Sequence, residues 1–155
     1  LKIIQKKHPQ FAFLSDVAET VIESLKEKFP GKVFQRALYV SRENARTLEA
    51  AALIQKGKVQ EFGALMYQTH LGLSKNYEVS CRELDFLVDL TQNLPQVVGS
   101  RMMGGGFGGC TINLVEDDFV SAFTHLAQEQ YKKEFGIAIS PILVETSNGV
   151  EITNT

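Results

Sequence analysis

The sequence predicts an α+β domain in which helices pack on one face of a four-stranded, mainly antiparallel sheet. Up to Thr91, apolar side chains recur at the spacing of helices, and from Val97 onward they alternate with the period of strands. Near the end of the chain, Asn148-Gly149 separates two β-type runs, which is the strongest short signal for a hairpin. A chain of 155 residues has the usual size of one compact domain, so a single domain is expected over residues 1–155.

The helical part contains one long helix and one clear start signal. The longest helical pattern runs from Val33 to Lys56, with Gly57 placed to end it. Ser80-Cys81-Arg82-Glu83 matches a capping box, so a further helix is expected to begin with Ser80 as its N-cap. Ala45, Leu48 and Ala52 are expected to form part of the inner stripe of the long helix.

From Val97 the chain is expected to form strands with one helix between them. Val97 to Met103 and Cys110 to Val115 are the first two predicted strands. A helix is expected between Asp117 and Gly136, and Ile142 to Thr153 are expected to form the terminal hairpin. This order of elements after Ser80 is related to the ferredoxin-like pattern.

The composition argues against several classes of function. A formal net charge of -2 gives no strong field to attract nucleic acid or an anionic membrane. The two cysteines, Cys81 and Cys110, lie far apart and lack the spacing of metal ligands, which favours a reducing compartment. We therefore expect a cytoplasmic protein without nucleic-acid or membrane partners.

The main candidate site is a glycine-rich run between the first two predicted strands. Main-chain N–H groups without a neighbouring Cβ can approach a ligand closely and form a nest for phosphate. The same glycines could instead serve only as a flexible connection between strands. The residues of this run are Gly104, Gly105, Gly106, Phe107, Gly108 and Gly109.

The run also fits the dinucleotide pattern G-x-G-x-x-G, but its surroundings do not. That pattern requires a helix to begin at the loop, whereas a strand is expected here. Protein kinases do place a strand, a glycine loop and a strand over ATP, but they need a lysine on the second strand. Cys110 to Val115 contains no lysine, so both interpretations fail.

Two longer motifs resemble the galactokinase family of the GHMP small-molecule kinases. Gly99-Ser-Arg-Met-Met-Gly-Gly-Gly-Phe-Gly-Gly-Cys-Thr111 closely resembles the third motif of that family. Tyr77-Glu-Val-Ser-Cys-Arg-Glu-Leu-Asp85 resembles its Y-E-V-S-C-P-E-L-D segment, and Arg46-Thr47 and Thr69-His70 fall in the family's order. The likeness runs from about Arg36 to Val115, with weaker agreement to the end.

The resemblance implies a C-terminal fragment of a sugar kinase. The family transfers phosphate from MgATP to the anomeric hydroxyl of α-D-galactose, in an active site between two domains. The catalytic residues, the sugar site and the ATP phosphate loop belong to the N-terminal domain, and nothing in this sequence matches them. The chain alone is therefore expected to be inactive, with no catalytic residue or metal ligand of its own. Galactose, ATP and Mg²⁺ would be bound mainly by its own N-terminal domain.

In that family the run from Gly104 to Gly109 is expected to lie beside the ATP phosphate loop and to complete the wall of the cleft. Such a division is physically reasonable, because phosphoryl transfer depends mainly on positioning and charge stabilisation. Ser100, Arg101 and Met103 are candidates for positions next to the site, with Arg101 adding positive charge.

The sequence departs from the family at a few positions. Met103 stands where the family usually has Thr, and a thioether cannot donate the hydrogen bond of a hydroxyl, which puts a polar role there in doubt. Arg82 stands where Pro is common, Tyr39 where His is common, and Thr69 where Ser is usual. None of these changes affects the glycines.

The remaining polar candidates have simpler explanations than catalysis. His70 lies on a predicted helix, where a helix hydrogen bond is favoured over direct chemistry. Asp85 and Asp89 share a helix face, but no further ligand accompanies them, so solvated acids are favoured over a metal site. Cys110 is expected to be a small buried side chain.

Three other functions stay open. Another sugar kinase of the superfamily, for example one acting on N-acetylgalactosamine, would share these motifs, because the sugar-reading residues lie in the other domain. A galactose sensor that binds sugar and ATP, and contacts a transcriptional regulator without turnover, would share them too. A stand-alone α+β binding module is the third, and the two matched motifs disfavour it.

Overall fold

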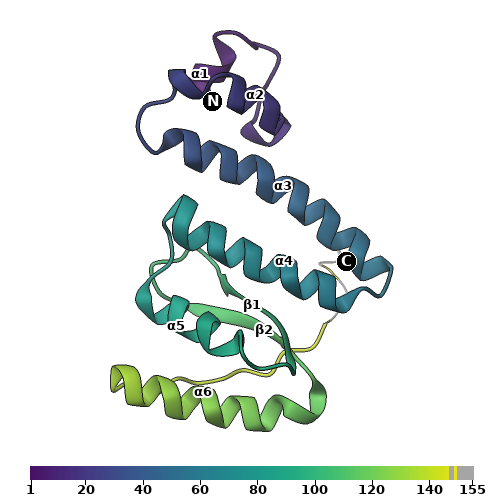
Figure 1. The fold of residues 1–155 in the computed structure, drawn as a ribbon, viewed down its shortest axis with the longest axis vertical. Coiled ribbons are helices and arrows are strands. Elements are labelled where there is room, and N and C mark those ends of the chain that lie inside the picture. The colour runs from purple at the N-terminus through teal and green to yellow at the C-terminus, as the bar shows by residue number, and fades with distance from the viewer. Residues whose placement is uncertain (147–148, 150–155) are drawn as a thin grey trace, which may run out of the picture.

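The structure is a computed structural model that describes residues 1–146 and residue 149 (Figure 1). The helices are α1 (Lys2–Gln5), α2 (Glu19–Ser24), α3 (Val33–Gln55), α4 (Val59–Gly72), α5 (Arg82–Thr91) and α6 (Val120–Phe135). The strands are β1 (Val97–Met103) and β2 (Cys110–Val115). Short 3-10 turns lie at η1 (Leu14–Asp16), η2 (Lys26–Lys28) and η4 (Asp117–Phe119), and a π-helical turn at η3 (Leu73–Tyr77).

Two of the helices end where the sequence predicts. Gly57 follows α3 with a φ of 66°, and Gly136 caps α6 with a φ of 70°. A left-handed residue lets the chain leave the helix while its last carbonyls remain hydrogen-bonded, and glycine adopts this conformation without the penalty of a Cβ.

The sheet is smaller than expected. β1 and β2 pair antiparallel from Met103 opposite Cys110 to Val97 opposite Val115, and they are the only strands among residues 1–146 and 149. Ile142, Leu143 and Val144, expected to begin the terminal hairpin, have no regular secondary structure and are 81%, 75% and 67% exposed. Their β-type side chains do not suffice, because strand formation depends on a partner strand and a packed face. The tip at Asn148 lies outside the described residues.

Helix α4 packs closely against β1. A Cβ on Gly63 of α4 would come within 2.0 Å of the Val98 carbonyl oxygen, and a Cβ on Gly99 within 2.7 Å of the Gly63 Cα. Because Gly63 and Gly99 lack a Cβ, the backbones of α4 and β1 can approach each other this closely. Helix α5 packs against both strands and against α6, so that the strands lie among α4, α5 and α6 (Figure 1).

Buried side chains gather in two regions joined by α3. The first lies in the N-terminal helical part and consists of Ile4, Val17, Ile22, Leu25 and Ala37. The second surrounds the strands and includes Leu84, Val88, Val97, Met102 and Ala127. The N-terminal helices make their main contacts with α3, which in turn packs against α4.

The residues expected on the inner stripe of α3 are wrong. Ala45, Leu48 and Ala52 are all exposed, and Leu48 retains 74% of its surface. The buried residues of α3 are instead Ala37, Tyr39 and Ser41, in its first half. Helical spacing identifies residues that share a face, but it does not reveal whether another element covers that face.

Candidate functional site

The glycine-rich run forms the connection between β1 and β2, and we call residues 104–109 the glycine loop. Much of it adopts left-handed backbone conformations, with a φ of 81° at Gly106 and 133° at Gly108. Phe107 also has a positive φ of 59°, and its side chain is 77% exposed. The geometry thus requires glycine at several positions, which accounts for part of the motif before any ligand is considered.

The glycine loop is fixed to the chain segment before α5. The Phe107 N–H donates a hydrogen bond of 2.7 Å to the Val79 carbonyl oxygen, and a Cβ on Gly106 would lie 2.0 Å from the same oxygen. The two motifs that carry the family resemblance therefore meet here. The loop is not simply a flexible connection. The sequence offers no signal for this role of Val79, because the residue contacts the loop through its backbone carbonyl and not through its side chain.

Gly105 differs from its neighbours. It lacks a positive φ, and a Cβ built on it would meet no atom within 4 Å. The fold itself does not require glycine at this position, and the backbone there is open to an approaching molecule.

His70 connects the last turn of α4 to the end of β1. It is 6% exposed; its Nδ1 accepts a hydrogen bond of 3.1 Å from the Met102 N–H, and its Nε2 lies 3.1 Å from Asp85 Oδ1. This arrangement places the ring proton on Nε2. Burial lowers the pKa of His70, against the opposing effect of Asp85, so the imidazole is neutral near pH 7. The expected helix hydrogen bond is replaced by bonds to two other elements.

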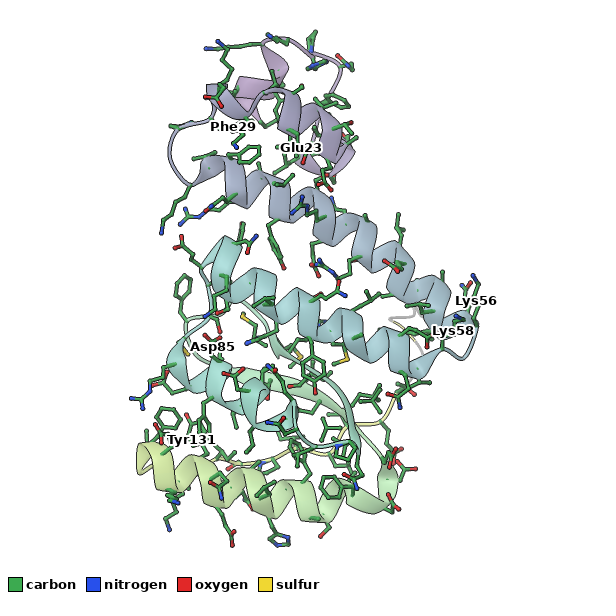
Figure 2. All side chains as sticks on the ribbon, in the orientation of Figure 1. Glu23, Phe29, Lys56, Lys58, Asp85 and Tyr131 are labelled. Carbon is green, nitrogen blue, oxygen red and sulfur yellow. The ribbon has the colours of Figure 1, made fainter. Side chains whose placement is uncertain are left out.

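Asp85 is the centre of this polar group, beside the start of α5 and below the end of α4 (Figure 2). Its carboxylate accepts hydrogen bonds from Ser80 Oγ at 2.6 Å and Ser74 Oγ at 2.8 Å. Burial raises the pKa of Asp85, but these hydrogen bonds, with the neighbouring His70 ring and Lys75 ammonium, outweigh it and lower the pKa. Asp85 is therefore not the solvated acid that its helix position suggested.

The same contacts change the start of α5. The helix begins at Arg82 with Cys81 as N-cap, and Ser80 makes no cap hydrogen bond. The predicted capping box is wrong because the Ser80 hydroxyl is committed to Asp85.

The remaining residues singled out from the sequence lie on the two strands, in environments that differ from one another. Ser100 is fully buried and donates a hydrogen bond of 2.6 Å to Asn113 of β2, so it stabilises the strand pair rather than facing the loop. Arg101 is half-buried on β1, and its charge opposes the rise that burial causes in the pKa of Tyr39. Met103 is 46% exposed and lies next to the loop. Cys110 is exposed, contrary to expectation, because it follows the loop at the end of the strand pair.

Among the described residues, no group of three or more His, Cys, Asp or Glu side chains could hold a metal ion. No helix within the described residues is both long and apolar enough to span a bilayer.

The family model for GHMP kinases C terminal matches residues 50–133, which include α4, the polar group around Asp85, both strands and the glycine loop. The chain belongs to this family. Within it, the chain is 35% identical to a galactokinase from Roseiflexus sp. over 97% of its length. It is also 38% identical over 90% of its length to the galactokinase of Homo sapiens.

A galactokinase of known structure has the same fold. The galactokinase of Lactococcus lactis complexed with galactose superimposes with a TM-score of 0.83 over 89% of this chain, at 32% identity. The chain covers 36% of that structure, 38% of the Roseiflexus relative and 34% of the human one. It thus spans somewhat more than a third of the length of these kinases.

Proposed function

We propose that this chain is the C-terminal domain of a galactokinase, which transfers phosphate from MgATP to galactose. The observation that carries the proposal is the similarity to proteins named galactokinase along nearly the whole chain, 97% for the Roseiflexus relative. The galactose in the Lactococcus lactis structure supports the choice of sugar, since that protein has the same fold at 32% identity.

In this proposal the glycine loop approaches the phosphates of ATP from the side of the C-terminal domain. The open backbone at Gly105 suits a phosphate group, because a Cβ built there would meet no atom within 4 Å and the residue itself adds no side chain. Arg101 would add positive charge nearby, and Met103 would lie beside the loop. Mg²⁺ and most of ATP would be held by an N-terminal domain, in a cytoplasmic enzyme.

The division of the site gives the chain a positioning role. Phosphoryl transfer is accelerated mainly by holding the reacting groups in place and by stabilising charge, so residues of two domains can contribute to one transition state. This chain would supply a wall of the cleft, whereas the proton-abstracting group and the sugar contacts would come from the other domain.

The proposal is tested by measuring ADP release in a coupled assay on two proteins. One is this chain alone, and the other joins it to an N-terminal part like that of the relatives. We expect galactose-dependent ADP release from the joined protein and none above background from the chain alone. Turnover with N-acetylgalactosamine but not galactose would identify a different sugar kinase. Binding of galactose and ATP without turnover would identify a sensor, and activity of the chain alone would refute the divided site.

A further inference from the structure

We propose that His70 and Asp85 are positioning residues that hold the glycine loop ready for nucleotide. The inference rests on the proposed function for its kinetic consequence, but its structural part stands on the contacts of the loop alone. Neither side chain belongs to the loop, and neither would touch the substrate.

The first connection is at the start of the loop. Met102 precedes the loop by two positions, and its backbone N–H donates to the Nδ1 atom of His70. Both side chains are buried, at 1% and 6% exposed, so the amide has no water to replace this acceptor. Loss of the acceptor would leave a buried N–H unsatisfied, which favours local opening of the chain at this point.

The second connection is inside the loop. The Phe107 N–H donates to the Val79 carbonyl, and the next residue, Ser80, donates its hydroxyl to Asp85 Oδ1. That same oxygen lies 3.1 Å from His70 Nε2. The Oδ1 atom of Asp85 thus contacts residues of both connections. On one side it lies next to His70, which accepts from the Met102 N–H. On the other side it accepts from Ser80, which follows Val79, the acceptor of the Phe107 N–H.

A glycine-rich loop gains more from such connections than other loops do. Glycine loses more conformational freedom on ordering than any other residue, so a ligand that orders a free glycine loop binds more weakly. If the fold orders the loop before ATP binds, the loop N–H groups are already oriented to donate hydrogen bonds to the phosphates. The expected consequence is a lower KM for ATP, with little effect on the sugar, whose contacts lie elsewhere.

The hydrogen bond from the Met102 N–H to His70 Nδ1 requires a neutral imidazole. An Nδ1 that carried a proton could not accept from Met102. The charged groups that act on His70 are Asp85, Asp89 and Lys75, and burial outweighs the two acids and lowers its pKa. His70 is therefore in the state that the connection needs near pH 7.

Two substitutions of His70 distinguish the contributions of its two ring nitrogens. Asparagine at position 70 places an acceptor oxygen near the site of Nδ1, whereas glutamine places an amide nitrogen near the site of Nε2. His70→Asn therefore keeps the bond from Met102 and loses the one to Asp85, and His70→Gln does the reverse. Thr91→Val is the matched control, because Thr91 is fully buried and hydrogen-bonded to Tyr67 but belongs to neither connection.

The variants are compared in the joined protein by steady-state kinetics and by hydrogen exchange of peptides that cover residues 98–112. For His70→Gln we expect faster exchange at the loop and a KM for ATP raised at least about tenfold, with the KM for galactose within about twofold. His70→Asn should recover the KM for ATP to within about threefold of the unsubstituted protein. Thr91→Val should lower the melting temperature without moving the KM for ATP.

An equal KM for ATP in all four proteins, with unchanged exchange at the loop, would overturn the inference. Equal increases in His70→Gln and Thr91→Val would also overturn it, since they would indicate general destabilisation. If His70→Gln does not fold, Ser80→Ala tests the second connection with the same two measurements. Should the unsubstituted protein phosphorylate no sugar, the proposed function fails, and the exchange experiment alone still decides whether His70 orders the loop.

Discussion

At the residue scale, neighbouring glycines of the loop are glycine for different reasons. Gly106 has a φ of 81°, and a Cβ there would overlap the Val79 carbonyl, so the fold requires glycine regardless of ligand. Gly105 has neither constraint. A substitution at Gly106 therefore cannot distinguish a nucleotide role from a structural one, whereas a substitution at Gly105 can.

Gly105→Val should leave the fold intact and impair the use of ATP. Because the added side chain meets no atom of the chain, we expect a free energy of unfolding within about 0.5 kcal/mol of the original. If phosphate approaches this backbone, kcat/KM for ATP should fall at least about tenfold, or about 1.4 kcal/mol. Urea unfolding and kinetics on one preparation of the joined protein measure both. Gly106→Ala is the contrast, with an expected loss of about 1–3 kcal/mol of stability. Unaltered kinetics in Gly105→Val would remove the support for a phosphate contact there.

At the scale of elements, the contact between α4 and β1 decides the position of His70. The two glycines at this contact let α4 approach β1 so closely that the Gly63 position lies against the Val98 carbonyl. His70 lies two helical turns further along α4, where it reaches the Met102 N–H. The distance between these elements therefore controls both the packing of the strands and the first connection of the glycine loop.

Gly63→Ala should destabilise the protein although it introduces the better helix former. In an open helix interior, this change would stabilise by up to about 1 kcal/mol. Here the new Cβ would lie 2.0 Å from a backbone oxygen that cannot rotate away, so we expect a net loss of at least about 2 kcal/mol. The neighbouring change Ala64→Gly, at an exposed position, should cost only about 1 kcal/mol. Urea denaturation compares the two, and a Gly63→Ala protein of unchanged or higher stability would disprove the close contact.

At the scale of the whole molecule, the two buried regions are separate and share α3. The N-terminal region around Ile4 and Ile22 packs on the first half of α3, and α3 connects it to α4 and the strands. Regions with few contacts between them can open independently, with different free energies. The site, which lies wholly in the second region, should then tolerate loosening of the first.

Ile22→Ala tests this independence. Ile22 is fully buried, and its truncation should cost about 2–4 kcal/mol within the N-terminal region. Hydrogen exchange should accelerate over residues 1–32, while β1, β2 and the glycine loop keep their protection. If exchange increases equally throughout, the chain unfolds as one cooperative unit and the division into two regions is wrong.

The sequence by itself determined the features that local patterns control. The bounds of β1 and β2, the ends of α3 and α6, and the glycine loop between the strands all agree with the prediction. Each follows from signals contained in a few consecutive residues: alternation along a strand, or glycine where the backbone turns left-handed. The family resemblance was likewise carried by two contiguous motifs.

Only the tertiary structure decided which residues meet. Leu48 fits an inner stripe but is exposed, and Asp85 fits a solvated face but accepts bonds from Ser80 and Ser74. The carbonyl of Val79 and the amide of Phe107, on which the order of the glycine loop depends, have no signature in side-chain identity. These contacts depend on how closely distant segments pack, and that distance is set by the whole set of elements rather than by any stretch of sequence alone.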